Sequence, residues 1–112
     1  MRAESANRPY LVGLVGAGIQ HSSSPSMHMD EGQSLGLQID YELLDFDLMP
    51  EGPARLAAVL DQCEQRGFTG LNVTYPSKQA VIPLLHELSA EARALHSVNT
   101  VLFRGGRRIG QN

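Results

Sequence analysis

A short apolar segment near the N-terminus, Tyr10–Gly16 with the sequence YLVGLVG, limits the available folds more than any other feature of the chain. The run is continuous rather than alternating, and it ends in glycine. Continuous apolar runs of this length are typical of strands that are buried on both faces, as strands of parallel sheets are. We therefore expect a parallel sheet at the centre of the fold.

Segments with helical and strand patterns alternate along the rest of the chain. In order, the expected elements are a helix over 24–35 opened by Ser24-Pro25, a strand over 40–45, a helix that Pro53 opens and Gly67 ends, a strand over 70–74, a helical stretch over 77–86 that Pro83 kinks or restarts, a short helix capped by Ser89, and strands over 97–104 and 107–110. The last two strands flank Gly105-Gly106, a pair that favours a tight hairpin. This alternation predicts the α/β class: a three-layer domain with a mostly parallel sheet and helices on both faces.

The length and charge of the chain exclude several classes of function. With 112 residues, we expect one domain over 10–112 after a disordered or extended tail over 1–9. The 9 Lys and Arg residues against 12 Asp and Glu residues give a net charge of −3, so no basic surface for nucleic acid is expected. No apolar stretch reaches the roughly 18 residues of a membrane span, and the N-terminal residues lack the pattern of a signal peptide. The single Cys63 makes neither an internal disulfide nor a zinc cluster, which favours the cytoplasm.

A glycine turn after the first strand has part of the pattern of a dinucleotide-binding loop. Gly16-Ala-Gly18 supplies two of the glycines, and Asp40 lies where an acidic residue that binds ribose would be. His21 stands at the position of the third glycine, and no helix begins at once. We therefore assign no cofactor-binding residue to this chain. No spacing of metal-ligating residues predicts a metal site either.

The polar loop that follows, His21-Ser-Ser-Ser-Pro25, is a candidate binding site. It comes at the carboxyl end of a parallel strand, where open α/β sheets bind ligands, and the next helix offers unpaired N–H groups to a carboxylate. Ser22 and Ser24 lie two residues apart and so face the same side of an extended loop. The alternative is that Ser24 only caps its helix and the other serines face water.

Two strand segments carry asparagine next to hydroxyl side chains. Asn72 and Thr74 share one face of the strand over 70–74, and Lys78 follows after a proline turn. A buried amide is costly unless it is hydrogen-bonded, and a lysine in a partly desolvated pocket can act as an acid or base. Asn99 begins another apolar strand, and two such asparagines suggest a polyhydroxylated ligand. We expect one cleft to be lined by all the candidates: Ser22, Ser24, Asn72, Thr74, Lys78 and Asn99. The alternative for Lys78 is an ordinary exposed lysine.

Three motifs together resemble the shikimate/quinate dehydrogenase family: His-Ser-x-Ser-Pro within 16–28, Asn-x-Thr-x-Pro-x-Lys within 67–85 and Val-Asn-Thr within 97–101. The likeness extends from about Tyr10 to Asn112. It implies the fold of that family's N-terminal substrate-binding domain, with shikimate, 3-dehydroshikimate or quinate as the small-molecule partner. It also implies NADP or NAD as the cofactor of the full-length enzyme, bound by a Rossmann domain that these 112 residues do not include.

The resemblance implies a role for each matched residue. Lys78 would be the catalytic lysine, which orients a hydroxyl and passes the proton that accompanies hydride transfer. Ser22 and Ser24 would bind the substrate carboxylate. The ring hydroxyls would be held by Asn72, Thr74 and Asn99. In the family a catalytic aspartate follows in Gly-x-Asn-Thr-Asp, whereas this chain ends at Gly110-Gln-Asn112.

The sequence leaves several alternatives open. Many family members have a proline-containing first loop and a histidine before the lysine. This chain has Gly-Ala-Gly-Ile-Gln20 and Ser77 at these positions, which favours the branch that also uses quinate. Ser24 in place of threonine favours shikimate. We expect an oxidoreductase of aromatic amino-acid biosynthesis whose 112-residue domain is inactive alone. The other hypothesis is a truncated, redox-inactive module that binds a small polyhydroxy carboxylic acid. Neither the choice of NAD or NADP nor homodimer formation is decided.

Overall fold

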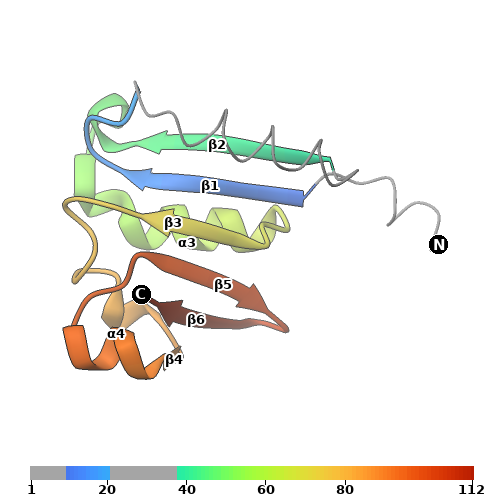
Figure 1. Ribbon diagram of the computed structural model, residues 1–112. Helices are drawn as coiled ribbons and strands as arrows, with labels where there is room; N and C mark the ends of the chain where they lie inside the picture. The colour runs from blue at the N-terminus through green and yellow to red at the C-terminus, as the bar shows by residue number, and fades with distance from the viewer. Residues whose placement is uncertain (1–9, 21–37) are drawn as a thin grey trace.

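The computed structural model describes residues 10–20 and 38–112, which form one sheet with helices packed against it (Figure 1). The strands are β1 (Tyr10–Gly16), β2 (Ile39–Asp45), β3 (Gly70–Val73), β4 (Glu87–Leu88), β5 (Thr100–Arg104) and β6 (Arg107–Gln111). The helices are α3 (Leu56–Gln65) and α4 (Ala90–Leu95), with the short 3-10 helices η1 (Phe46–Leu48), η2 (Gly52–Arg55) and η3 (Ile82–Leu84). The tail expected over 1–9 and the helix expected over 24–35 lie outside the described residues.

The sheet is mixed, which modifies the expectation of a mostly parallel one. Its strand order is β2-β1-β3-β5-β6-β4. β1 is parallel to β2 and β3, and β4 is parallel to β6, whereas β5 is antiparallel to both β3 and β6. The antiparallel pairing of β5 with β6 follows from Gly105-Gly106, where φ is 55° and 79°, because a two-residue turn can join only antiparallel neighbours. The α/β class and the hairpin are confirmed.

The larger apolar core lies between one face of the sheet and the helices. Val15 of β1 points into this core, whereas Leu14 points to the opposite face, as the alternation of a strand requires. Ala92 of α4 belongs to the same core. The buried residues of α3 are those that its spacing predicts: Leu56, Val59, Leu60 and Cys63. The opposite face of the sheet carries Tyr41, and it is this face that bears on function below.

Residues 77–86 do not form the α-helix that their pattern predicts, and that prediction is wrong. Turns lead into η3, where the Leu84 N–H donates to the Val81 carbonyl at 2.9 Å, a bond of the tighter 3-10 type. Pro83 has no N–H and its ring prevents a continuous α-helix. The chain directly after this segment pairs with the sheet as β4, a two-residue strand that the sequence pattern does not predict.

The two α-helices begin and end close to their sequence signals. Pro53 lies in η2, so α3 itself starts three residues later than expected, and Gly67 follows its end with a φ of 85°. Ser89 caps α4 as predicted, because its Oγ accepts the Ala92 N–H at 3.1 Å. Within the described ranges, no helix is long and apolar enough to cross a lipid bilayer.

Candidate functional site

The turn after β3 lies directly against the end of β1. The Thr74 N–H donates to the Val15 carbonyl at 3.0 Å, and the Ala17 N–H donates to the Tyr75 carbonyl at 2.8 Å. Gly16 allows this approach: a Cβ there would overlap the Thr74 methyl group and lie 2.8 Å from the Tyr75 oxygen. The glycine therefore sets the distance between the two turns at the carboxyl ends of these parallel strands.

Backbone hydrogen bonds bring Lys78 and Asn99 to the same end of the sheet. The Val98 N–H donates to the Lys78 carbonyl at 2.8 Å, and the Val73 N–H donates to the Asn99 carbonyl at 2.8 Å. Lys78 is the only lysine of the chain, and its side chain is exposed. It borders a shallow hollow together with Tyr75, Pro76, Gln79 and Ser97. An exposed ammonium group at this edge is accessible to a ligand.

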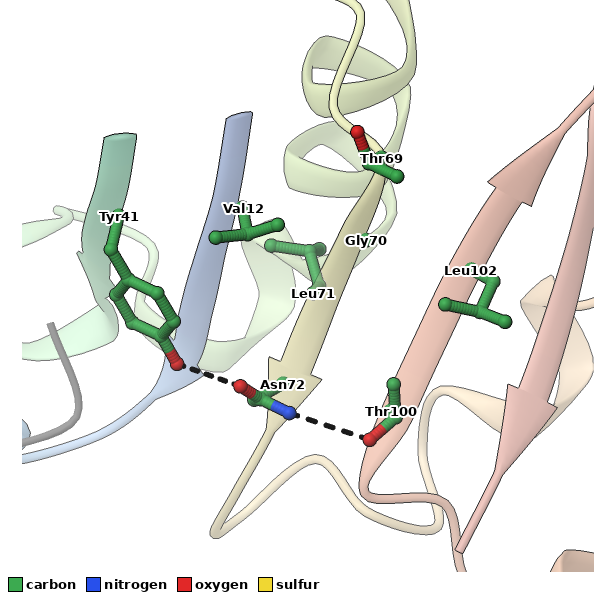
Figure 2. Close-up of a pocket in the computed structure, with 8 residues that line it drawn as sticks. All are labelled: Val12, Tyr41, Thr69, Gly70, Leu71, Asn72, Thr100 and Leu102. Carbon is green, nitrogen blue, oxygen red and sulfur yellow. Dashed lines mark hydrogen bonds between the residues drawn. The ribbon is translucent and has the colours of Figure 1, made fainter. Parts of the chain in front are cut away.

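Asn72 lies on the sheet face opposite α3, in a different hollow from Lys78. The Tyr41 hydroxyl donates to Asn72 Oδ1 at 2.8 Å, and Asn72 Nδ2 donates to the Thr100 hydroxyl at 3.3 Å (Figure 2). These two bonds offset the cost of placing an amide inside the sheet. The other residues that line this hollow are Val12, Thr69, Gly70, Leu71 and Leu102. Backbone hydrogen bonds therefore join the segments that carry these candidates. The Asn72 and Lys78 side chains, however, border separate hollows rather than the one cleft expected from the sequence.

The Asn99 side chain is linked to Asn72 through Thr100. The Thr100 hydroxyl donates to Asn99 Oδ1 at 3.0 Å, and Asn99 Nδ2 donates to Asn112 Oδ1 at 3.3 Å. Asn112 Nδ2 donates in turn to the Ser97 carbonyl at 3.1 Å. The two asparagines predicted from the sequence therefore belong to one hydrogen-bonded group.

Three side chains of this group, those of Tyr41, Thr100 and Asn112, do not appear among the candidates from sequence. A usable signal was present for Thr100, because it adjoins Asn99 and lies opposite Asn72 once β3 and β5 are paired. Tyr41 has no such signal, since it reaches Asn72 from β2, beyond β1 in the sheet. The candidates Ser22 and Ser24 lie outside the described residues.

The glycine turn after β1 is held by a carboxylate of the protein itself. The buried Asp45 side chain accepts hydrogen bonds from the Gly18 N–H at 3.1 Å, the Ile19 N–H at 3.2 Å, the Asp47 N–H at 2.9 Å and Gln20 Nε2 at 3.2 Å. The Asp47 N–H bond is the main cause that lowers the pKa of the Asp45 carboxyl below its ordinary value of 3.8. Burial raises the pKa of this carboxyl, and the other three bonds lower it further. Asp45 thus occupies two N–H groups that a diphosphate would need in a dinucleotide loop.

We expect Asp45→Asn to lower the stability of the chain at neutral pH and to change its dependence on pH. Because the pKa is lower in the folded state, the carboxylate stabilises the fold above its unfolded value of about 3.8, and this contribution is lost as the pH falls through the folded value. Urea unfolding at several pH values should therefore show a gap between the two proteins that is constant near neutrality and shrinks below pH 3.8. Asp47→Asn is the matched control, since that side chain is exposed. A gap of equal size at acid and neutral pH contradicts the expectation.

The described residues give no support for metal or thiol chemistry. In residues 10–20 and 38–112, no three His, Cys, Asp or Glu side chains gather as a metal site would require. Cys63 is buried in α3, and burial raises the pKa of its thiol to about 11. A thiol with this pKa is protonated at neutral pH and a poor nucleophile, so Cys63 has a structural role.

Comparison with known proteins finds similar sequences along most of the chain. The family model for the shikimate dehydrogenase substrate-binding domain matches residues 14–101. The NADP(+) shikimate dehydrogenase of Streptomyces avermitilis is 45% identical over 92% of this chain, which covers 35% of that enzyme.

Solved structures show the same similarity. Quinate dehydrogenase from Corynebacterium glutamicum, in complex with NAD, matches with a TM-score of 0.87 at 40% identity, over 95% of this chain and 38% of that one. Shikimate 5-dehydrogenase from Thermus thermophilus, in complex with shikimate, matches with a TM-score of 0.81 at 37% identity, over 92% of this chain and 38% of that one. The chain therefore spans little more than a third of the length of the relatives it matches.

Proposed function

The chain belongs to the shikimate dehydrogenase family, as its substrate-binding domain, and from this premise we propose that it binds the substrate of an oxidoreductase that interconverts 3-dehydroshikimate and shikimate, or the quinate pair. The enzyme acts with NADP or NAD in aromatic amino-acid biosynthesis, in the cytoplasm. The relatives named above support this assignment, since one is a shikimate dehydrogenase and another a quinate dehydrogenase.

One observation carries the proposal: two of the family's motifs meet at the carboxyl end of β3. The motif that contains Lys78 and the motif that contains Asn99 are joined by the Val98 N–H bond to the Lys78 carbonyl, and the Val73 N–H bond to the Asn99 carbonyl fixes both to the strand. Ligands of open α/β sheets bind at this edge. The arrangement supports a polar site at which a ring with several hydroxyl groups meets amide, hydroxyl and ammonium partners.

In the proposed site each residue has one task. Lys78 orients the hydroxyl at the reacting carbon and holds the proton that this oxygen gains or loses. Ser22 and Ser24 bind the carboxylate, and Asn99 and Thr74 hold ring hydroxyls. Asn72 is partly engaged by Tyr41 and Thr100, yet its second Nδ2 hydrogen and a second lone pair on Oδ1 leave it able to bind a hydroxyl as well.

The described residues do not fit a nicotinamide cofactor. The turn at Gly16-Ala-Gly18 would be the natural cradle for a diphosphate, but the Gly18 and Ile19 N–H groups donate to Asp45. We therefore assign the cofactor to a part of the enzyme other than residues 10–20 and 38–112, and no step of the reaction is derived through it. For the same reason we expect the 112-residue chain alone to be inactive.

A binding experiment on the 112-residue chain tests the proposal. We expect shikimate to shift the backbone amide signals of Thr74, Lys78 and Asn99 in a saturable NMR titration, while benzoate, a ring carboxylate without hydroxyls, shifts them much less. Titration with NAD or NADP should show no submillimolar binding, and neither cofactor should support turnover. Ser22→Ala should weaken shikimate binding about tenfold, because a hydrogen bond to a charged group is lost.

Ser23→Ala is the matched control for Ser22→Ala, because the i, i+2 spacing predicts that Ser23 faces the other side of the loop. Shikimate shifts that occur elsewhere on the chain, or no saturable binding at all, contradict the proposed function. The second hypothesis, a general module for polyhydroxy acids, predicts instead that gluconate binds as tightly as shikimate and quinate.

A further inference from the structure

Five side-chain hydrogen bonds run in one direction across the sheet, from β2 to the residue after β6. Tyr41 donates to Asn72, Asn72 to Thr100, Thr100 to Asn99, Asn99 to Asn112, and Asn112 to the carbonyl of Ser97. Figure 2 shows the first two bonds, with the Asn72 amide extended between the Tyr41 and Thr100 hydroxyls. The group thus links the two asparagines that the proposed function assigns to the substrate.

The direction of these bonds is set by the group at the end of the series. The Ser97 carbonyl can only accept, so Asn112 must present its Nδ2 to it and its Oδ1 to Asn99. Asn99 must then donate from Nδ2 and accept at Oδ1 from Thr100. Since the Thr100 hydroxyl has a single proton, it must accept from Asn72. Neither the Asn72 amide nor the Asn99 amide can be rotated by 180° without placing two acceptors or two donors against each other.

We propose that Thr100 and Tyr41 are positioning residues that hold the Asn72 and Asn99 amides in one orientation for the ring hydroxyls of the substrate. The inference rests on the proposed function and adds to it the residues that prepare the site. Each amide uses one Nδ2 hydrogen within the described part of the chain, so a fixed orientation also fixes where the second one points. A preoriented amide binds a hydroxyl without first losing rotational freedom, which strengthens binding.

Thr100 is the centre of the arrangement, because its hydroxyl both accepts and donates. Valine has the same shape but no hydroxyl, so Thr100→Val removes both bonds while the half-buried strand position keeps a β-branched side chain. Serine restores the hydroxyl without the methyl group. Comparison of the two variants therefore separates the hydrogen-bonding role from a packing role in β5.

The experiment measures the two asparagine side-chain amides and the affinity for shikimate in the same 112-residue chain. In Thr100→Val we expect the side-chain NH₂ signals of Asn72 and Asn99 to shift and their order parameters to fall, and shikimate to bind about fivefold more weakly. Thr100→Ser should restore both. Tyr41→Phe should weaken binding about threefold, and should change it less than about 1.5-fold in an Asn72→Ala background, since Tyr41 acts through that amide.

Two results overturn the inference while leaving the proposed function in place. The first is that both side-chain amides keep their signals and order in Thr100→Val. The second is that the amides change but shikimate affinity does not, although Asn72→Ala and Asn99→Ala lower it. If Asn72→Ala and Asn99→Ala leave shikimate affinity unchanged, the substrate roles of the asparagines are wrong and the inference falls with them, while the amide signals still show whether Thr100 orients the two groups.

Discussion

Replacement of Lys78 by alanine should lower kcat of the complete enzyme by about 10²- to 10⁴-fold, with a much smaller change in shikimate affinity. The proposed lysine holds the proton that the substrate oxygen gains or loses, and that interaction is strongest in the transition state. The backbone at position 78 is fixed independently of the side chain, through the Val98 N–H bond to its carbonyl. The variant therefore removes the ammonium group without removing the contact that positions the turn.

The measurement needs a cofactor domain, supplied by joining the corresponding part of the Corynebacterium glutamicum relative. Gln79→Ala is the matched control, because Gln79 is also exposed, lies on the same turn and borders the same hollow. Since the 112-residue chain has a single lysine, reductive ¹³C-methylation of that chain without the cofactor domain adds one side-chain probe at Lys78, whose signal should move on addition of shikimate. Wild-type kcat in Lys78→Ala, or a probe that shikimate leaves unmoved, contradicts the proposed role.

The local signals in the sequence predicted those parts of the fold that local chemistry determines. The apolar stripe of α3, the Ser89 cap of α4 and the turn at Gly105-Gly106 each depend on residues within about two helical turns of one another, and all three are present. The stretch over 77–86 has a helical pattern, but Pro83 outweighs it. The short strand β4 pairs with β6, which lies about 20 residues later in the chain, and no local sequence pattern reveals this pairing.

The candidate site was even harder to predict from local sequence patterns. Asn72, Lys78 and Asn99 could be picked out because polar residues are unusual at the ends of apolar strands, and the sheet brings their backbones together. Their partners could not be predicted, because Tyr41 lies 31 positions before Asn72 and becomes its neighbour only through the strand order β2-β1-β3. Asp45 is a similar case: its carboxylate meets the Gly18 N–H across 27 positions. Sequence spacing therefore points to candidate functional groups more readily than to the partners that hydrogen-bond to them.

Gly16→Ala should disturb the site more than any other single-methyl change at this edge. The new Cβ would overlap the Thr74 methyl group and lie 2.8 Å from the Tyr75 carbonyl oxygen, closer than such atoms approach. The turn must then move away from β1, which stretches the Thr74 N–H bond to Val15 and the Ala17 N–H bond to Tyr75. We expect a loss of about 1–3 kcal/mol in the free energy of unfolding, as in other overpacked sites. Shikimate affinity should fall at least tenfold, because the displaced turn carries the Thr74 hydroxyl and leads to Lys78.

Urea unfolding and the shikimate titration measure the two effects, and two further variants isolate their cause. Adding Thr74→Ser to Gly16→Ala removes the overlapping methyl group but keeps the hydroxyl, so it should restore part of the stability and part of the affinity. Gly105→Ala is the control for a general cost of replacing glycine. Its φ of 55° makes the substitution strained, but nothing lies within 4 Å of the added methyl group, and the hairpin is at the other end of β5. Gly105→Ala should therefore lower the free energy of unfolding by about 1 kcal/mol while leaving shikimate affinity intact. If Gly16→Ala keeps wild-type affinity, the close approach of the two turns is not what forms the binding site.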